Sequence, residues 1–193
     1  MSKIFYLMGK SASGKDTIYK EIKELLPELK TIVIYTTRPI REGEQEGVEY
    51  HFVDEEKLQE FQDAGKVIEL RAYNTVHGVW KYFTVNDGQF DAEDNYIAIG
   101  TLESYKGMRA HLGEEKLVPI YIEVDDGLRL ERALSRERQQ KEPKYEELCR
   151  RFLADAADFS EENLQEAGIH YRYANVDKEK CVNEIILGIR EKM

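Results

Sequence analysis

The stretch G-K-S-A-S-G-K at residues 9–15 decides the fold. It follows a short apolar run, Lys3–Met8, and precedes Asp16–Leu26, where apolar residues recur at helical spacing. Such a loop between a strand and a helix is typical of phosphate binding, because its backbone N–H groups and the helix N-terminus surround phosphate oxygens. We therefore expect nucleotide phosphates to contact the loop and the first helical turn, at Gly9, Ser11, Ala12, Ser13, Gly14, Lys15, Asp16 and Thr17.

Two residues at the end of this loop indicate how the negative charge of the phosphates would be neutralised. Lys15 is placed to reach the β- and γ-phosphates. The next residue of such loops is usually a serine or threonine that meets Mg²⁺, whereas this chain has Asp16. A carboxylate can hold Mg²⁺ directly or through water, so we expect ATP with Mg²⁺ and assign Asp16 as a metal ligand. The alternative is an acidic first-turn residue favoured by the helix dipole.

The pattern outside the loop alternates between strand and helix. The expected core strands are Lys3–Met8, Thr31–Thr36, Asn95–Ile99, Leu117–Val124 and His170–Ala174. Two more strands, Val67–Leu70 and Trp80–Val85, are expected with an irregular connection between them. The expected helices are Asp16–Leu26, the segment from Asp54 to Gly65, the segment from Leu102 to Gly113, 126–138, 145–166 and Lys178–Lys192. Alternation of this kind predicts an α/β fold whose five-stranded parallel sheet is flanked by helices.

No linker divides the chain, so we expect residues 1–193 to form a single phosphate-loop kinase domain. Two segments interrupt the alternation and are predicted to be inserts, an acceptor-binding region at 35–86 and a helical lid at 126–155. Ligands of such sheets bind at the carboxyl ends of the strands, which places both inserts near the loop.

Composition limits the possible partners. The formal net charge of −10 argues against nonspecific binding to nucleic acid or an anionic membrane, and no apolar run reaches the ~20 residues of a membrane span. Cys149 and Cys181 are far apart and lack the spacing of metal ligands, which favours a reducing cytoplasm. The expected partners are therefore ATP and a small acceptor. Nothing in the sequence indicates an oligomeric state.

The segment T-T-R-P-I-R-E-G-E-Q-E-G-V-E-Y-H-F at 36–52 closely resembles the acceptor-binding segment of guanylate kinases. The matched residues are Thr36, Thr37, Arg38, Arg41, Gly43, Glu44, Gly47, Tyr50 and Phe52. The resemblance implies that Arg38, Arg41 and Tyr50, with Thr36 nearby, hold the phosphate of GMP or dGMP. The chemistry agrees, because guanidinium groups bind phosphate in a bidentate manner and a tyrosine hydroxyl adds a donor.

Glu69, in V-I-E-L, resembles the family's base-reading glutamate, whose carboxylate accepts from guanine N1–H and the exocyclic amine. The following N-T-V-H-G-V-W-K-Y-F-T at 74–84 is a longer, altered version of a family segment. Within it, Tyr82 and Thr84 best match residues that contact the acceptor. The resemblance extends to the lid, where it implies roles for Arg136 and Arg151, and to Y-A-N-V-D at 173–177, where Asn175 would lie near adenine.

The implied activity is transfer of the ATP γ-phosphate to GMP, with Lys15, Arg38, Arg136 and Arg151 as the catalytic cations. One departure from the family pattern lies at residues 99–103, where Ile99 and Thr101 replace two aspartates. Together with Asp16, this departure favours an alternative, a ribose 1,5-bisphosphate phosphokinase-like enzyme. A non-catalytic interaction module is a further alternative, although such modules generally have degraded phosphate loops and Lys15 is intact.

Overall fold

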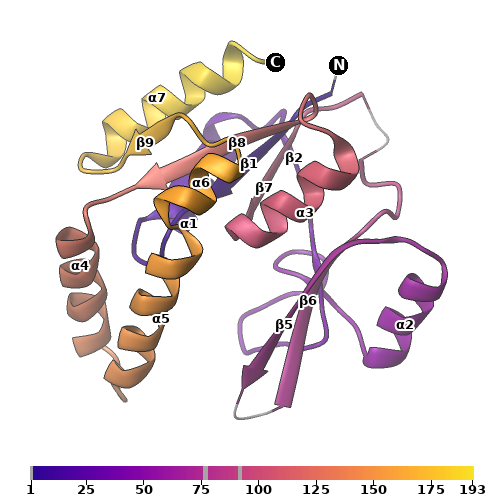
Figure 1. Ribbon diagram of the computed structural model, residues 1–193, viewed down its shortest axis with the longest axis horizontal. Helices are drawn as coiled ribbons and strands as arrows, with labels where there is room; N and C mark the ends of the chain where they lie inside the picture. The colour runs from indigo at the N-terminus through magenta and orange to yellow at the C-terminus, as the bar shows by residue number, and fades with distance from the viewer. Residues whose placement is uncertain (1, 76–77, 91–92) are drawn as a thin grey trace.

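The structure is a computed structural model that describes residues 2–75, 78–90 and 93–193 (Figure 1). Its core is a parallel sheet of five strands, as the sequence predicts. In spatial order the strands are β2 (Lys30–Thr31), β7 (Tyr96–Gly100), β1 (Ile4–Met8), β8 (Leu117–Glu123) and β9 (Arg172–Ala174).

Helices cover both faces of this sheet. They are α1 (Lys15–Leu25), α3 (Leu102–Leu112), α6 (Glu161–Glu166) and α7 (Lys178–Arg190). Side chains of β1 alternate between the faces, so that Phe5 and Leu7 pack with α1 and α7 while Ile4 and Met8 pack with α3 and α6. Every residue of β1 is buried, so the loop that follows is attached to the central strand of the core sheet.

A second, smaller sheet lies beside the core (Figure 1). Its strands are, in order, β4 (His51–Phe52), β3 (Tyr35–Thr36), β6 (Gly78–Val85) and β5 (Val67–Thr75). Helix α2 (Glu55–Asp63) is capped by Asp54, whose side chain accepts from the Lys57 N–H. Leu58 of this helix packs on Phe83 and Val85 of the sheet, which gives the small sheet an apolar core of its own.

Three local expectations about secondary structure are wrong. The strand expected at Thr31–Thr36 is divided, because the chain leaves the core sheet after β2 and joins the small sheet at β3. The connection expected to be irregular between Leu70 and Trp80 is instead a continuation of both strands, whose antiparallel pairing extends as far as Thr75 and Gly78.

The third wrong expectation concerns one long helix at 145–166. The structure has α5 (Tyr145–Asp158) and then α6, a separate helix capped by Ser160, whose side chain accepts from the Asn163 N–H.

Helix α4 (Asp126–Arg138) and α5 form a helical hairpin that projects from the core opposite the β5–β6 hairpin (Figure 1). Within the described ranges, no helix is both long enough and apolar enough to cross a bilayer.

Candidate active site

The phosphate-binding loop runs from Gly9 at the end of β1 to Lys15 at the start of α1. Two of its glycines are required by geometry. A Cβ on Gly9 would lie 2.7 Å from the carbonyl oxygen of Ile122, and Gly14 has a φ of 87° in the left-handed region. Ala12 also has a positive φ, 62°, which is rare for a residue with a Cβ and is typical of functional loops.

Two buried side chains support the loop from other parts of the chain. The Asn175 amide, only 5% exposed, donates to the Ser13 carbonyl at 2.7 Å. The Arg129 guanidinium, 1% exposed, donates to the Ser11 carbonyl at 2.8 Å and stacks on Phe152. Asn175 was expected to contact ATP, and the contact that it makes here is with the loop itself. Arg129 was not singled out from the sequence, because Asp126 three residues earlier makes it resemble an ordinary helix-surface ion pair.

Lys15 and Asp16 face the same cleft. The Lys15 Nζ lies 3.3 Å from the Asp16 carboxylate, whose side chain is 79% exposed. Among the residues that the structure describes, no group of three His, Cys, Asp or Glu side chains is arranged to hold a metal ion. One carboxylate beside a phosphate loop still fits Mg²⁺, which commonly takes one or two carboxylates and completes its shell with phosphate oxygens and water.

Helix α5 of the helical hairpin contacts the loop at Ser11. The Arg151 guanidinium donates to the Ser11 Oγ at 3.0 Å, and the Ser11 backbone N–H donates to the Asp155 carboxylate at 2.8 Å. Arg151 therefore lies where a lid cation is expected. Arg136 does not line the same cleft but a separate cavity of about 140 Å³, which also contacts Ser11 and Arg151. The Asp155 carboxylate is a second feature that the sequence pattern did not indicate.

Arg38, which follows β3 by two residues, is buried and paired with a carboxylate. Its guanidinium, 3% exposed, donates to both oxygens of Glu44 at 2.7 and 2.5 Å. The same guanidinium lies 4.9 Å from the centre of the Tyr50 ring and 5.3 Å from that of Phe52. The adjacent Thr36 hydroxyl accepts from the Arg38 N–H, so it shapes the backbone at this point.

Aromatic side chains connect this arginine to the cleft. Tyr50 and Tyr82 both line the cleft, and their ring centres are 5.6 Å apart. Arg41 lies over the ring of Trp80, which lines the cleft as well. The structure thus places Arg38 and Arg41 against the rings of Tyr50 and Trp80, although neither arginine is among the residues that line the cleft.

Glu69 and Thr84 form a buried pair rather than part of the cleft wall. The Thr84 hydroxyl, 1% exposed, donates to Glu69 Oε1 at 2.7 Å. Arg71 donates to the same carboxylate from Nε at 2.9 Å and from Nη2 at 3.4 Å. Arg71 lines the cleft, whereas Glu69 and Thr84 are absent from its lining. Arg71 is therefore a site residue that sequence reasoning missed.

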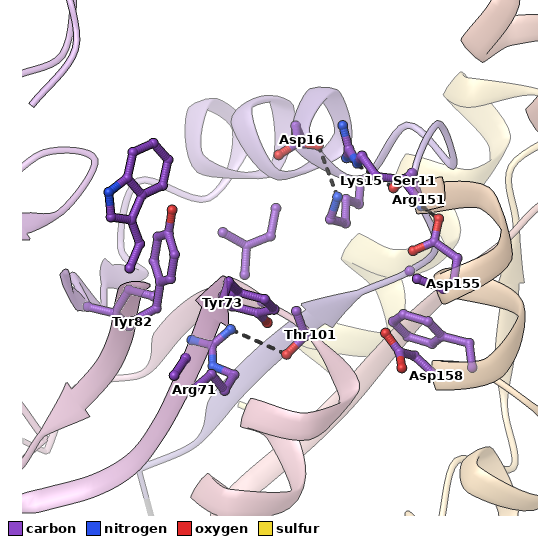
Figure 2. Close-up of a pocket in the computed structure, with 18 of the residues that line it drawn as sticks. Ser11, Lys15, Asp16, Arg71, Tyr73, Tyr82, Thr101, Arg151, Asp155 and Asp158 are labelled. Carbon is purple, nitrogen blue, oxygen red and sulfur yellow. Dashed lines mark hydrogen bonds and ion pairs between the residues drawn. The ribbon is translucent and has the colours of Figure 1, made fainter. Parts of the chain in front are cut away.

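One cleft of about 660 Å³ is lined by the phosphate loop, by Arg71 and Tyr50 of the acceptor region, and by Arg151 of α5. Figure 2 shows Ser11, Lys15 and Asp16 on one side of it and Arg71 with Tyr73 on another. Ile99 and Gly100 at the end of β7, and Thr101 directly after it, also line the cleft. Ile99 and Thr101 stand where the family pattern has two aspartates. From the altered segment at 74–84, the cleft is lined by Asn74, Thr75, Trp80 and Tyr82, and Val76 and His77 are outside the described residues.

The pairing of Arg38 with Glu44 has a consequence for stability in acid. The hydrogen bonds from Arg38 lower the pKa of Glu44 from 4.5 to about 2. Because the folded-state pKa is the lower one, the pair stabilises the fold fully above pH 4.5 and loses its effect as the pH falls toward 2. We expect Glu44→Gln to lower the free energy of unfolding by about 1–2 kcal/mol at pH 6.

Denaturant unfolding at several pH values checks this expectation. The difference between wild type and Glu44→Gln should shrink as the pH falls from 4.5 to 2. Glu49→Gln, at an exposed carboxylate in the same loop, is a matched control. Stability curves of wild type and Glu44→Gln that stay parallel over this range would show that the ion pair does not stabilise the fold.

Comparisons with known proteins find similarity to one family. The family model described as guanylate kinase matches residues 1–158. A guanylate kinase of Frankia casuarinae is 48% identical over 63 residues, which are 33% of this chain and 34% of that protein. A guanylate kinase of Mycobacterium tuberculosis is 37% identical over 78 residues, 40% of this chain and 36% of that protein. The chain therefore matches about a third of the length of these curated relatives.

A solved structure is similar over the whole chain. The crystal structure of guanylate kinase from Anaplasma phagocytophilum superposes with a TM-score of 0.64 at 25% sequence identity. The superposition covers 100% of this chain and 87% of that one. The similarity thus includes the small sheet and the helical hairpin as well as the core.

Proposed function

The chain belongs to the guanylate kinase family, and we propose that it transfers the γ-phosphoryl group of ATP to GMP or dGMP, giving ADP and GDP or dGDP. One observation carries the proposal. The same cleft is lined by the phosphate loop at Gly9, Ser11 and Lys15 and by the acceptor-segment residues Tyr50 and Tyr82. Donor and acceptor phosphates bound at these two places would lie within one cleft, as direct phosphoryl transfer requires.

Cations around the cleft would do most of the catalytic work. Lys15 would contact the β- and γ-phosphates, and Arg151, already in contact with Ser11, would add charge from the lid. Arg41 and Tyr50 would hold the acceptor phosphate, and Arg38 would join them by exchanging its bonds to Glu44 for bonds to the phosphate. Arg136 would reach the site only after movement of the helical hairpin that carries it. The acceptor is a phosphate oxygen that is already ionised, so the transfer depends on positioning and electrostatic stabilisation rather than on a general base.

The residues near the loop fit a magnesium ion supplied with ATP. Bound there, Mg²⁺ would neutralise phosphate charge during the transfer. Asp16 would hold it, since this exposed carboxylate is directly beside Lys15. Asp16 thus takes the position that a hydroxyl usually has in such loops.

The magnesium role of Asp16 is testable by substitution. We expect Asp16→Ser to raise the Mg²⁺ concentration at half-maximal rate several-fold, because a neutral hydroxyl binds a hard cation more weakly than a carboxylate does. Glu179→Gln, at an acidic first-turn residue of α7, is the matched control. An unchanged magnesium titration in Asp16→Ser would leave Asp16 as a residue that only favours the start of α1.

The choice of acceptor is tested by ADP release with GMP, dGMP, AMP, UMP and ribose 1,5-bisphosphate. The proposal predicts turnover with GMP and dGMP and little with AMP or UMP. Turnover with the ribose compound but not with GMP would instead support the ribose bisphosphate kinase, which Asp16 and the acid-free end of β7 favour. No turnover with any acceptor would support a non-catalytic module.

We place this activity in the cytoplasm, with ATP and a nucleoside monophosphate as partners. The proposal is supported by the two cysteines, which are free thiols in the structure, and by the acidic composition of the chain. No role in binding nucleic acid or a membrane is proposed.

A further inference from the structure

Ser11 of the phosphate loop is bonded to the helical hairpin through all three of its polar groups. Its backbone N–H donates to the Asp155 carboxylate at 2.8 Å, and its carbonyl oxygen accepts from the Arg129 guanidinium at 2.8 Å. Its Oγ accepts from Arg151 at 3.0 Å. The N–H groups in the first turn of α1, from Lys15 onward, have no acceptor within the helix and are therefore left for phosphates. Ser11 thus connects the loop to the hairpin.

The residue after Ser11 has a strained backbone. Ala12 has a φ of 62°, a conformation that a Cβ disfavours and that persists only where the surrounding contacts enforce it. Ser11 on one side is held by the hairpin, and Ser13 on the other side accepts from the Asn175 amide at 2.7 Å. Side chains from distant parts of the chain therefore hold the loop in this shape on both sides of Ala12.

The charges that hold Ser11 are balanced within the hairpin. Arg129, only 1% exposed, donates to Asp126 from Nε at 3.0 Å and from Nη2 at 2.7 Å. Its Nη1 contacts the Ser11 carbonyl and lies 3.5 Å from Asp155 Oδ2, the same oxygen that accepts from the Ser11 N–H. Asp126 would keep Arg129 paired if Asp155 were replaced. Removal of the Asp155 carboxylate would therefore leave no buried charge without a partner.

Asp155 also determines where Arg151 lies. The two residues are four apart in α5, so they are neighbours on one face of the helix. Both contact Ser11, which fixes α5 against the loop at two points one helical turn apart (Figure 2). Without Asp155, the place of Arg151 beside the loop would depend on its bond to the Ser11 hydroxyl.

We infer that Asp155 is a positioning residue of the donor site. Together with Arg129 it holds Ser11, so that the loop keeps its phosphate-binding shape and Arg151 stays beside it. The inference deepens the proposed function and rests on its placement of ATP at the loop, independently of which acceptor is used. Asp155 belongs to α5 and not to the acceptor segment, so its replacement should affect ATP and leave the acceptor site intact.

Calorimetric titration with ATP and Mg²⁺, without an acceptor, gives the first test. We expect Asp155→Ala to raise the Kd for ATP about tenfold or more, because the Ser11 N–H loses its acceptor. Asp155→Asn should stay within about threefold of wild type, since an amide oxygen can replace Oδ2 toward Ser11 and Arg129. Glu146→Ala, at an exposed carboxylate in the first turn of α5, is the control and should not change the Kd.

Two results of this titration would overturn the inference. One is an equal Kd for wild type and Asp155→Ala. The other is tighter binding by Asp155→Ala, which would mean that the carboxylate competes with phosphate for the Ser11 N–H. Failure of the wild-type protein to bind ATP would overturn the proposed function as well. A wild-type protein that binds ATP but does not phosphorylate GMP would contradict the proposed function alone, because the titration needs no acceptor.

Steady-state kinetics distinguish positioning from general damage to the fold. Asp155→Ala should raise KM for ATP about tenfold, while KM for GMP stays within about twofold of wild type. Equal increases in the two KM values would show a structural role only and would overturn the inference.

Two double substitutions test how Asp155 acts. Ala12→Gly removes the strain at a positive φ, so in that background Asp155→Ala should raise the Kd for ATP by no more than about threefold. Arg151→Met should lower kcat by a smaller factor in the Asp155→Ala background than in wild type, because a displaced Arg151 contributes less. Effects that simply add in both pairs would show that Asp155 acts neither through the loop nor through Arg151, and would overturn the inference.

Discussion

Replacing Lys15 with methionine is expected to lower kcat for phosphoryl transfer by about 100- to 1,000-fold. The ammonium group lines the cleft beside the phosphate loop, and its ion-pair partner is the exposed Asp16. Methionine keeps much of the length and volume of the side chain but removes the charge that would stabilise the migrating phosphoryl group. Steady-state measurement of ADP release at saturating ATP and GMP checks the effect.

The fold should tolerate this change. The Lys15–Asp16 pair is exposed, so we expect the free energy of unfolding to change by no more than about 0.5 kcal/mol. Lys20→Met, at an exposed lysine later in α1, removes a charge of the same kind and should leave kcat unchanged. A Lys15→Met variant with near-normal kcat would mean that the loop does not position ATP as proposed.

The second large effect is expected at Arg38. Arg38→Met should lower kcat/KM for GMP by about 100-fold or more, because it removes a guanidinium beside Tyr50 that would bind the acceptor phosphate in exchange for Glu44. It should also lower the free energy of unfolding by about 2–3 kcal/mol, since Glu44 is left without its partner in a largely buried position. Enzyme kinetics and denaturant unfolding on the same preparation measure the two effects separately.

A double substitution distinguishes binding from folding at this position. Adding Glu44→Gln to Arg38→Met removes the unpaired carboxylate, so part of the lost stability should return while kcat/KM for GMP stays low. Recovery of activity together with stability would show that Arg38 only maintains the fold. In that case the acceptor phosphate would depend on Arg41 and Tyr50.

The core of the fold could be predicted because its determinants are local. The loop at Gly9–Lys15, with a strand before it and a helix after it, specifies the centre of the sheet, and the alternation of strand and helix specifies parallel pairing. The five-strand parallel sheet confirms that prediction. The division of Thr31–Thr36 between two sheets could not be predicted, because the segment is uniformly β-branched or aromatic and its pairing partners lie far away in the sequence.

Some side chains of the site could not be predicted for the same reason, because their contacts are with residues far away in the sequence. Arg71 and Arg129 each have an acidic neighbour two or three residues away, which is the pattern of an ordinary surface pair. Their functional contacts are with Thr101 and with Ser11, 30 and 118 residues away in the sequence. The loop motif thus indicated Lys15, and the family resemblance indicated Arg38 and Tyr50, whereas burial and long-range contacts identified the residues that hold Glu69 and the loop in place.

The central claim is that ATP and GMP react directly in one cleft. The most direct test is to incubate the protein with ATP, GMP and Mg²⁺ and to quantify all four nucleotides over time. The account predicts that GDP and ADP form in equal amounts and that Lys15→Met suppresses both. Formation of ADP without GDP, or no consumption of ATP, would contradict it.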